Sequence, residues 1–350
     1  MIPYWLLFLY FAAGALLAPE ADNARERNVL FLWLGAVLMA LMIGFRYKVG
    51  ADWNAYEDIF DFSRRAGLER MLRLFNDPAY ALLTWGVAGL GGSIWLVNLV
   101  CGAIFSWGLL RFARAQANPW LAMTVAVPYL VVVVAMGYSR QAVAIGILMA
   151  GLASVINGAS TLRFAVYVVA AATFHKTAVI MLPLVAFAQP RSRLINLLIG
   201  FALTYLFYDM FLSEHVNFLY RNYIKAEYSS QGAAVRVVLN SIPSLLYLIN
   251  RRNFGFTPVE SKMWFYFSIT SLALLAALMA VPSSTAVDRM ALYVIPVQIA
   301  IWSRVHVAYN LGRFGRVLVV ALSAAILFIW LSFAVNAQYW VPYQLYPVWT

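Results

Sequence analysis

Charged residues are scarce in this chain. Only 11% of its 350 residues are Asp, Glu, Lys or Arg, while 64% are hydrophobic and the mean hydropathy is +0.78. An ordinary soluble domain carries about 25% charged residues. The shortage of charge therefore excludes a soluble globular domain and indicates an all-α polytopic membrane protein.

Cysteine and histidine are also rare, with one cysteine and three histidines in the chain. A single cysteine excludes a disulfide framework, and Cys101 stands in an apolar run as a small hydrophobic residue. Zinc sites use clusters of histidine and cysteine, which the sequence lacks. The pair Asp58 and Asp61 is more typical of a solvated helix face than of a metal site. We therefore expect no metal and no cofactor.

The chain has no repeat of 20–50 residues, no low-complexity tract and no linker rich in glycine, serine or proline. We therefore expect a single integral membrane domain over residues 1–350. The net charge of +11 does not require a nucleic-acid partner, because basic residues of membrane proteins first mark topology and contact lipid headgroups.

Long apolar runs make up most of the chain. We expect about twelve membrane spans, near residues 3–18, 29–45, 94–110, 119–137, 141–156, 162–174, 177–188, 194–212, 235–249, 263–281, 290–303 and 317–334. The first run lacks the positive region of a signal peptide, so we interpret it as a retained span. The segment 79–90 is shorter than the roughly 20 residues that cross a bilayer, and it is expected to form an amphipathic interfacial or re-entrant helix.

Arginine and lysine are unevenly divided between the two sides of these spans. One side receives most of the cations of the short linkers, including Arg111, Arg114, Arg251 and Arg252. Positive residues accumulate in short cytoplasmic loops, so this side is expected to be cytoplasmic and both termini to lie outside. The outer face then holds a large loop at 46–92 and a second loop at 213–234.

Several outer-face cations stand at the ends of predicted spans. They are Arg46, Arg140, Lys176 and Arg289. Ionisable groups at this depth are costly unless protein or a water-filled cavity receives them. Guanidinium groups match phosphate oxygens bidentately, so a ring of such cations suits a phosphate or pyrophosphate. The alternative is that they anchor the protein to headgroup phosphates, and Asp288–Arg289 is alternatively a local ion pair.

Two outer-face groups are candidates for a general base. Asp52 is preceded by Gly50, which would permit a positive φ or a close backbone approach. His175 lies between two short apolar segments, and it is alternatively a structural histidine bonded to a carbonyl. Aromatic residues crowd the same face, including a charge-free stretch at 339–349. They predict either an interfacial belt or platforms for sugar rings.

Four motifs in this order resemble the EpsG family, the Wzy-like exopolysaccharide and O-antigen polymerases. The first is Arg46-Tyr47-x-Val49-Gly50-x-Asp52-x-x-x-Tyr56. The second is Asp77-Pro78-x-Tyr80, where the family usually has Glu-Pro-Gly followed by Tyr or Phe. The others are Arg140-Gln141 and His175-Lys176-x-Ala178. The resemblance covers residues 29–190.

The resemblance implies a GT-C-like glycosyltransferase of the bacterial inner membrane, working on its periplasmic face without a metal. Donor and acceptor would both be undecaprenyl-diphosphate-linked glycans in the lipid membrane. An acceptor hydroxyl would attack the donor anomeric carbon, and undecaprenyl diphosphate would leave. A chain-length regulator is a further partner that this function would use.

The resemblance and the residue chemistry together assign roles. Pyrophosphate is expected to contact Arg46, Arg140, Arg289 and Lys176, with Asp52 preferred over His175 as the base. Contacts with glycan or lipid are expected from Tyr47, Tyr56, Asp77, Tyr80, Gln141, Arg221 and Tyr223.

Three other functions fit parts of the pattern. A flippase or transporter of lipid-linked oligosaccharide would also need many spans and a cationic lumen, although such proteins tend to show two similar halves. An O-antigen ligase shares the donor and the leaving group. A scaffold subunit of an export complex would not need cations at this depth.

Overall fold

The computed structural model describes residues 1–18, 25–188, 205, 232–280 and 284–348 of the chain. Over these residues the chain is helical and forms no strand apart from one isolated bridge. The prediction of an all-α fold is therefore confirmed, and the long apolar helices are those of a membrane-embedded protein.

The helices follow one another through short connections. The first part of the chain forms α1 (Ile2–Leu17), α2 (Arg25–Gly44), α3 (Trp53–Ser63), α4 (Leu68–Leu74), α5 (Pro78–Gly89), α6 (Ile94–Arg114), α7 (Pro119–Ala126) with its π-helical continuation η2 (Val127–Ala135), α8 (Ser139–Ile156) and α9 (Thr161–Phe174). The second part forms η3 (Lys176–Ile180), α10 (Met181–Ala186), α13 (Ala233–Ile249), η5 (Arg251–Phe254), α14 (Pro258–Ala280), α15 (Ser284–Val294), α16 (Pro296–Trp302), α17 (Val305–Ala308), α18 (Gly312–Phe333) and η6 (Val335–Tyr339).

Within the described residues, four helices are long and apolar enough to cross a bilayer, namely α6, α8, α14 and α18. The other apolar runs that lie within the described ranges carry shorter helices. The predicted span at 194–212 falls almost wholly outside the described residues, as does most of the loop at 213–234. The number of twelve spans and the GT-C-like architecture therefore stay predictions.

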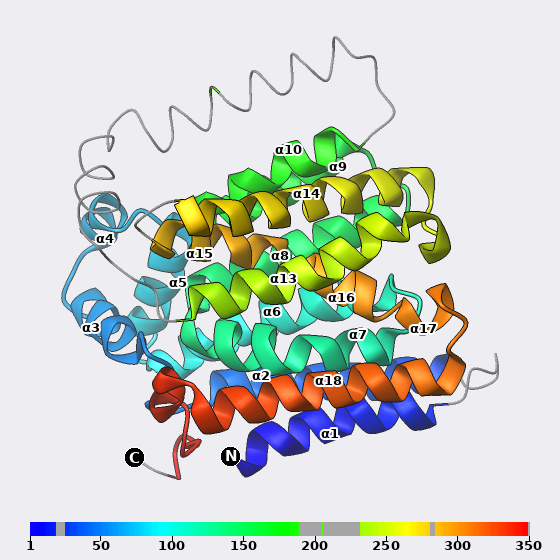
Figure 1. Ribbon diagram of the computed structural model, residues 1–350. Helices are drawn as coiled ribbons and strands as arrows, with labels where there is room; N and C mark the ends of the chain where they lie inside the picture. Colours follow the sequence, from blue (N-terminus) through cyan, green and yellow to red (C-terminus); the bar gives the residue numbers. More distant parts are fainter. Residues whose placement is uncertain (19–24, 189–204, 206–231, 281–283, 349–350) are drawn as a thin grey trace.

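The helices lie side by side in one bundle, and its two ends differ (Figure 1). Helices α3, α4 and α5 gather at one end, where both termini also lie. We call this the outer end. Helix α5 has 12 residues, and a helix of that length is only about 18 Å long. It packs on α3, α4, α6 and α9 and is too short to cross, as the sequence predicted.

The opposite end collects the cations of the short connections. Helix α6 ends at Arg114, α13 is followed by Arg251 and Arg252, and Arg313 stands in the first turn of α18. The charge asymmetry seen in the sequence is therefore an asymmetry between the two ends of the bundle.

The C-terminal segment is bound into the outer end. The amide of Tyr47 donates to Gln344 O at 3.0 Å, and the amide of Tyr346 donates to Phe45 O at 2.8 Å. Trp340 is buried and its Nε1 donates to Val132 O at 2.7 Å. This part of the aromatic stretch therefore seals the bundle, where the sequence had favoured an interfacial belt.

Gly50 occupies a position that another residue would not tolerate. Its φ is +109°, and a Cβ built on it would lie 2.4 Å from Met136 O. Its amide donates to Tyr339 O at 2.9 Å. Both the positive φ and the close approach expected of Gly50 are confirmed.

Replacing Gly50 by alanine should therefore destabilise the protein. We expect a loss of about 1–3 kcal/mol in the free energy of unfolding, because a backbone oxygen cannot rotate away from the new methyl group. Thermal unfolding in detergent measures it. Gly67→Ala is the matched control, since no atom lies within 4 Å of its Cβ position. Equal melting temperatures for the two variants would contradict the assignment.

Candidate functional site

An ion pair at the outer end joins α5 to α8. Arg140 Nη1 lies 2.7 Å from Asp77 Oδ2. Asp77 directly precedes α5, and Arg140 stands in the first turn of α8. The Asp77 side chain is 5% exposed and that of Arg140 is 35% exposed. The pair thus holds a guanidinium that still reaches the surface.

His175 lies on the other side of the same carboxylate. Its Nδ1 is 3.8 Å from Asp77 Oδ1, beyond hydrogen-bond distance. His175 ends α9, and the chain then turns into η3, which packs back against α9. Asp77 therefore stands between two groups that the sequence singled out, Arg140 and His175.

The surroundings of Asp77 favour its ionised form. Burial alone would raise the pKa of this carboxyl. The interaction with His175 and the positive charge of Arg140 outweigh the effect of burial and lower the pKa below its usual value. Asp77 is therefore a fixed anion rather than an acid or base that changes state near neutral pH.

Asp52 is a carboxylate of the opposite kind. It directly precedes α3 and is half-buried. Burial raises the pKa of Asp52, and the charges of Arg289 and Arg140 offset the rise only in part. A carboxylate with a raised pKa is a better proton acceptor than an ordinary one. Arg140 and Arg289 both lie near enough to Asp52 for their positive charges to act on it.

Two buried tyrosines form an aromatic wall beside Arg140. The rings of Tyr56 and Tyr80 are 5.7 Å apart between centroids. The guanidinium carbon of Arg140 lies 5.8 Å from the first ring centroid and 5.9 Å from the second. The backbone amide of Arg140 also donates to the Tyr56 hydroxyl at 3.5 Å. These cation–π contacts orient the guanidinium group through its planar face, so they do not occupy its N–H donors.

Arg289 is held in place through its backbone. Gln141 Nε2 donates to Arg289 O at 2.9 Å, while the Arg289 side chain is exposed. Next to it, the buried Asp288 lies 2.6 Å from Nη1 of the buried Arg236 on α13. Asp288 thus forms a long-range ion pair with Arg236. The sequence had offered a local Asp288–Arg289 pair instead.

Thr177 and Tyr293 form a further contact next to His175 and Arg289. Their hydroxyls are 2.8 Å apart, which links η3 to α15. Neither residue was singled out in the sequence, because a threonine and a tyrosine in apolar runs carry no distinct signal. Their position beside His175 and Arg289 becomes visible only in three dimensions.

Arg46 is not brought to this group. Its side chain is buried and donates to Ile43 O at 2.6 Å and Val49 O at 3.2 Å. It also donates to Asn98 Oδ1 at 3.1 Å and Ser139 Oγ at 2.8 Å. The fork of Arg46 is therefore engaged inside the protein, where it ties α2 to α6 and α8.

The remaining predicted residues divide into three cases. Lys176 follows His175 and is half-buried. Tyr47 packs edge-on against Trp53 of α3, with ring centroids 5.9 Å apart. Arg221 and Tyr223 lie outside the described residues. Among the residues that the structure describes, no group of three or more His, Cys, Asp or Glu is arranged to hold a metal.

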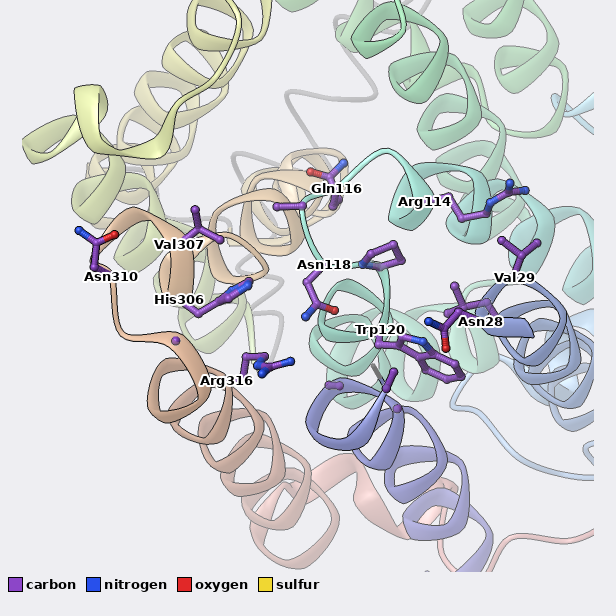
Figure 2. Close-up of a pocket in the computed structure, with 17 residues that line it drawn as sticks. Asn28, Val29, Arg114, Gln116, Asn118, Trp120, His306, Val307, Asn310 and Arg316 are labelled. Atoms are coloured by element: carbon purple, nitrogen blue, oxygen red, sulfur yellow. The ribbon is translucent and has the colours of Figure 1, made fainter. Parts of the chain in front are cut away.

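A cavity lined by other residues lies far from this group. It has a volume of about 860 Å³ and opens between α1, α2, the start of α7 and the start of α18. Figure 2 shows Arg114, Asn118, His306 and Arg316 around it. It lies at the opposite end of the bundle from Asp77 and Arg140, so we give it no part in the chemistry of the outer end.

Taken together, these features define a class of protein: a helical membrane protein with a cationic, aromatic and carboxylate-bearing site at one end of its bundle. The model of the EpsG family matches residues 29–345. The chain therefore belongs to the EpsG family, whose members are Wzy-type polysaccharide polymerases. Comparison with curated proteins and with solved structures gives no match.

The burial of Arg46 leads to a stability prediction. Arg46→Ala should lower the free energy of unfolding by several kcal/mol, because each buried acceptor left without a donor costs about 1–3 kcal/mol. Arg46→Lys should not restore it, since one ammonium cannot reach four acceptors. Melting temperatures in detergent test both variants.

Arg73→Ala provides the control for this prediction. Arg73 is exposed and pairs with the exposed Glu69, and such surface pairs contribute about 0–1 kcal/mol. If Arg46→Ala melted at the temperature of Arg73→Ala, the structural role of Arg46 would be refuted.

Proposed function

We propose that this protein polymerises undecaprenyl-diphosphate-linked oligosaccharide repeat units into O-antigen or exopolysaccharide. Membership of the EpsG family indicates a polysaccharide polymerase of the membrane glycosyltransferase type. An acceptor sugar hydroxyl attacks the anomeric carbon of the donor's reducing-end sugar, and undecaprenyl diphosphate leaves. The outer end of the bundle corresponds to the periplasmic face of a bacterial inner membrane.

The leaving group needs cations more than it needs an acid. Negative charge grows on the diphosphate oxygens as the glycosidic bond breaks, and preorganised cations stabilise that charge. Arg140 and Arg289 form this clamp, with Lys176 behind them. Arg46 supports the clamp from inside the protein, since it donates to Ser139, the neighbour of Arg140.

Asp52 acts as the base that receives the proton of the attacking hydroxyl. Its raised pKa and its position in the field of both arginines support this role. His175, which lies beside Asp77, is the second candidate. Tyr56, Tyr80 and Gln141 complete the walls that face glycan or lipid, and the short helix α5 guides the polyprenyl tails along the membrane plane. A chain-length regulator is a further expected partner.

The observation that carries the proposal is the convergence of Asp52, Asp77, Arg140, His175 and Arg289 at one end of the bundle. These residues come from separate stretches of the sequence. Such a group unites a candidate base with cations suited to a diphosphate.

Incubation of the purified protein with lipid-linked repeat units tests the proposal directly. A ladder of longer glycans is the expected product. A single addition to lipid A core would instead indicate a ligase, and movement of substrate across vesicles without extension would indicate a flippase. Either of these two results would refute the polymerase.

The clamp can be tested by exchanging arginine for lysine. Arg140→Lys should keep the charge but lose the bidentate fork, so we expect kcat/KM to fall by about 10- to 100-fold, equivalent to the roughly 1.5–3 kcal/mol of a charge-assisted hydrogen bond. Arg73→Lys should leave it unchanged. Full activity in Arg140→Lys would show that a simple positive charge suffices there.

The base can be tested through pH dependence. Asp52 must be ionised to accept a proton, so activity should decline as pH falls through its pKa, at a pH above the ordinary aspartate value of about 3.9. Asp52→Asn should lower kcat by about 10²–10⁴-fold and remove this acid limb. An unchanged acid limb in Asp52→Asn would transfer the role to His175.

A further inference from the structure

A small cavity of about 190 Å³ opens at the outer end, beside α3. Tyr47, Trp53, Glu57, Asp61, Trp95 and Tyr346 line it. They come from the segment after α2, from α3, from the start of α6 and from the C-terminal segment. Four separate parts of the chain thus build one pocket about the size of a single sugar ring.

Stacked aromatic rings hold one wall of this pocket rigid. The ring of Trp95 stacks on Phe45, with centroids 5.4 Å apart and an interplanar angle of 16°. It also stacks on Tyr346, at 5.5 Å and 21°. Tyr346 is further fixed by its backbone bond to Phe45. Rigid aromatic surfaces of this kind suit the apolar C–H faces of pyranose rings, because little ordering is needed on binding.

The formal charges of the pocket lining balance. Glu57 and Asp61 are matched by Arg46 and Arg64, and Asp61 lies 3.7 Å from Arg64 in an exposed pair. The N–H groups of Arg46 are directed to neutral protein oxygens, so Arg46 keeps its charge but is already bonded within the protein. A pocket lining without net charge suits a neutral sugar ring, and the half-buried Glu57 and the exposed Asp61 can accept hydrogen bonds from its hydroxyls.

Helix α3 connects this pocket to the ion-pair site. Trp53, Glu57 and Phe60 follow one another at helical spacing on the side that lines the pocket. Tyr56, which contacts Arg140, stands three residues after Trp53 and four before Phe60. Residues at these spacings are neighbours on a helix surface, so the two sites lie on adjoining strips of α3. An oligosaccharide of a few sugars is long enough to reach both.

We propose that this pocket binds one neutral pyranose ring of the glycan, beside the arginine site that receives its diphosphate. This inference rests on the proposed function, because it names a subsite for the same substrate. Glu57 and Asp61 accept hydrogen bonds from ring hydroxyls, and the Trp95–Tyr346 wall contacts the apolar face. The subsite thus recognises sugar identity, while the arginines recognise the carrier.

The test uses the repeat-unit oligosaccharide released from its carrier, so that the probe bears no diphosphate. Saturation-transfer NMR should detect its binding to the wild-type protein in detergent. The double variant Glu57→Gln, Asp61→Asn should weaken oligosaccharide binding about tenfold, the effect of a lost charge-assisted hydrogen bond. Asp58→Asn, on the same helix and exposed, should bind as the wild type does.

Chain extension gives a second readout. The double variant should raise KM for lipid-linked substrate and leave kcat near that of the wild type, as expected when binding is lost equally in ground and transition states. Unchanged oligosaccharide binding in a folded double variant would overturn the subsite, even if the wild type makes a ladder. If the wild type makes no ladder, the polymerase proposal fails, and the NMR comparison alone decides the pocket.

Discussion

The outer end of the protein depends on the buried guanidinium of Arg46. Its fork donates to oxygens on the end of α2, on the loop that follows, on α6 and on α8. Each of these groups would be costly to bury without a partner. The same segment pairs with the C-terminal chain through Phe45 and Tyr47. One side chain therefore sets the relative positions of three helices and of the loop that carries Asp52.

The two carboxylates of the site, Asp77 and Asp52, have pKa values that are shifted in opposite directions. Asp77 is held between Arg140 and His175, and its pKa is lowered, so it serves as a fixed negative charge. Asp52 has fewer compensating contacts, and burial raises its pKa. Carboxyl groups whose surroundings move their pKa values apart are a common basis for distinct roles in one active site. This difference is the reason why we propose proton transfer for Asp52 and a structural role for Asp77.

Much of the site could be predicted from the sequence because its residues stand at helix ends. Asp52, Asp77, Arg140 and His175 each interrupt or follow an apolar run, where a charged group is conspicuous. The direction of a side chain is not visible in such a pattern. Arg46 occupies the same kind of position as Arg140, yet it turns inward, because Asn98 and Ser139 offer acceptors that come from distant parts of the chain.

Long-range partners set the limits of sequence reasoning in this fold. The pairing of Arg236 with Asp288 and the contact of Thr177 with Tyr293 each join residues that lie far apart in the chain. The all-helical fold was easier to predict from the sequence, since long apolar runs form helices. The number of membrane crossings was harder to predict, because several helices are shorter than a bilayer is thick.

The participation of the C-terminal segment in the outer end has a consequence for biogenesis. Tyr4 donates to Trp340 O across a sequence separation of 336 residues, and Phe45 and Tyr47 bond to residues 344–346. During synthesis the early helices enter the membrane long before these partners exist. The outer end can therefore be completed only after residues 340–346 have been synthesised, so a nascent chain stopped short of them would lack these contacts.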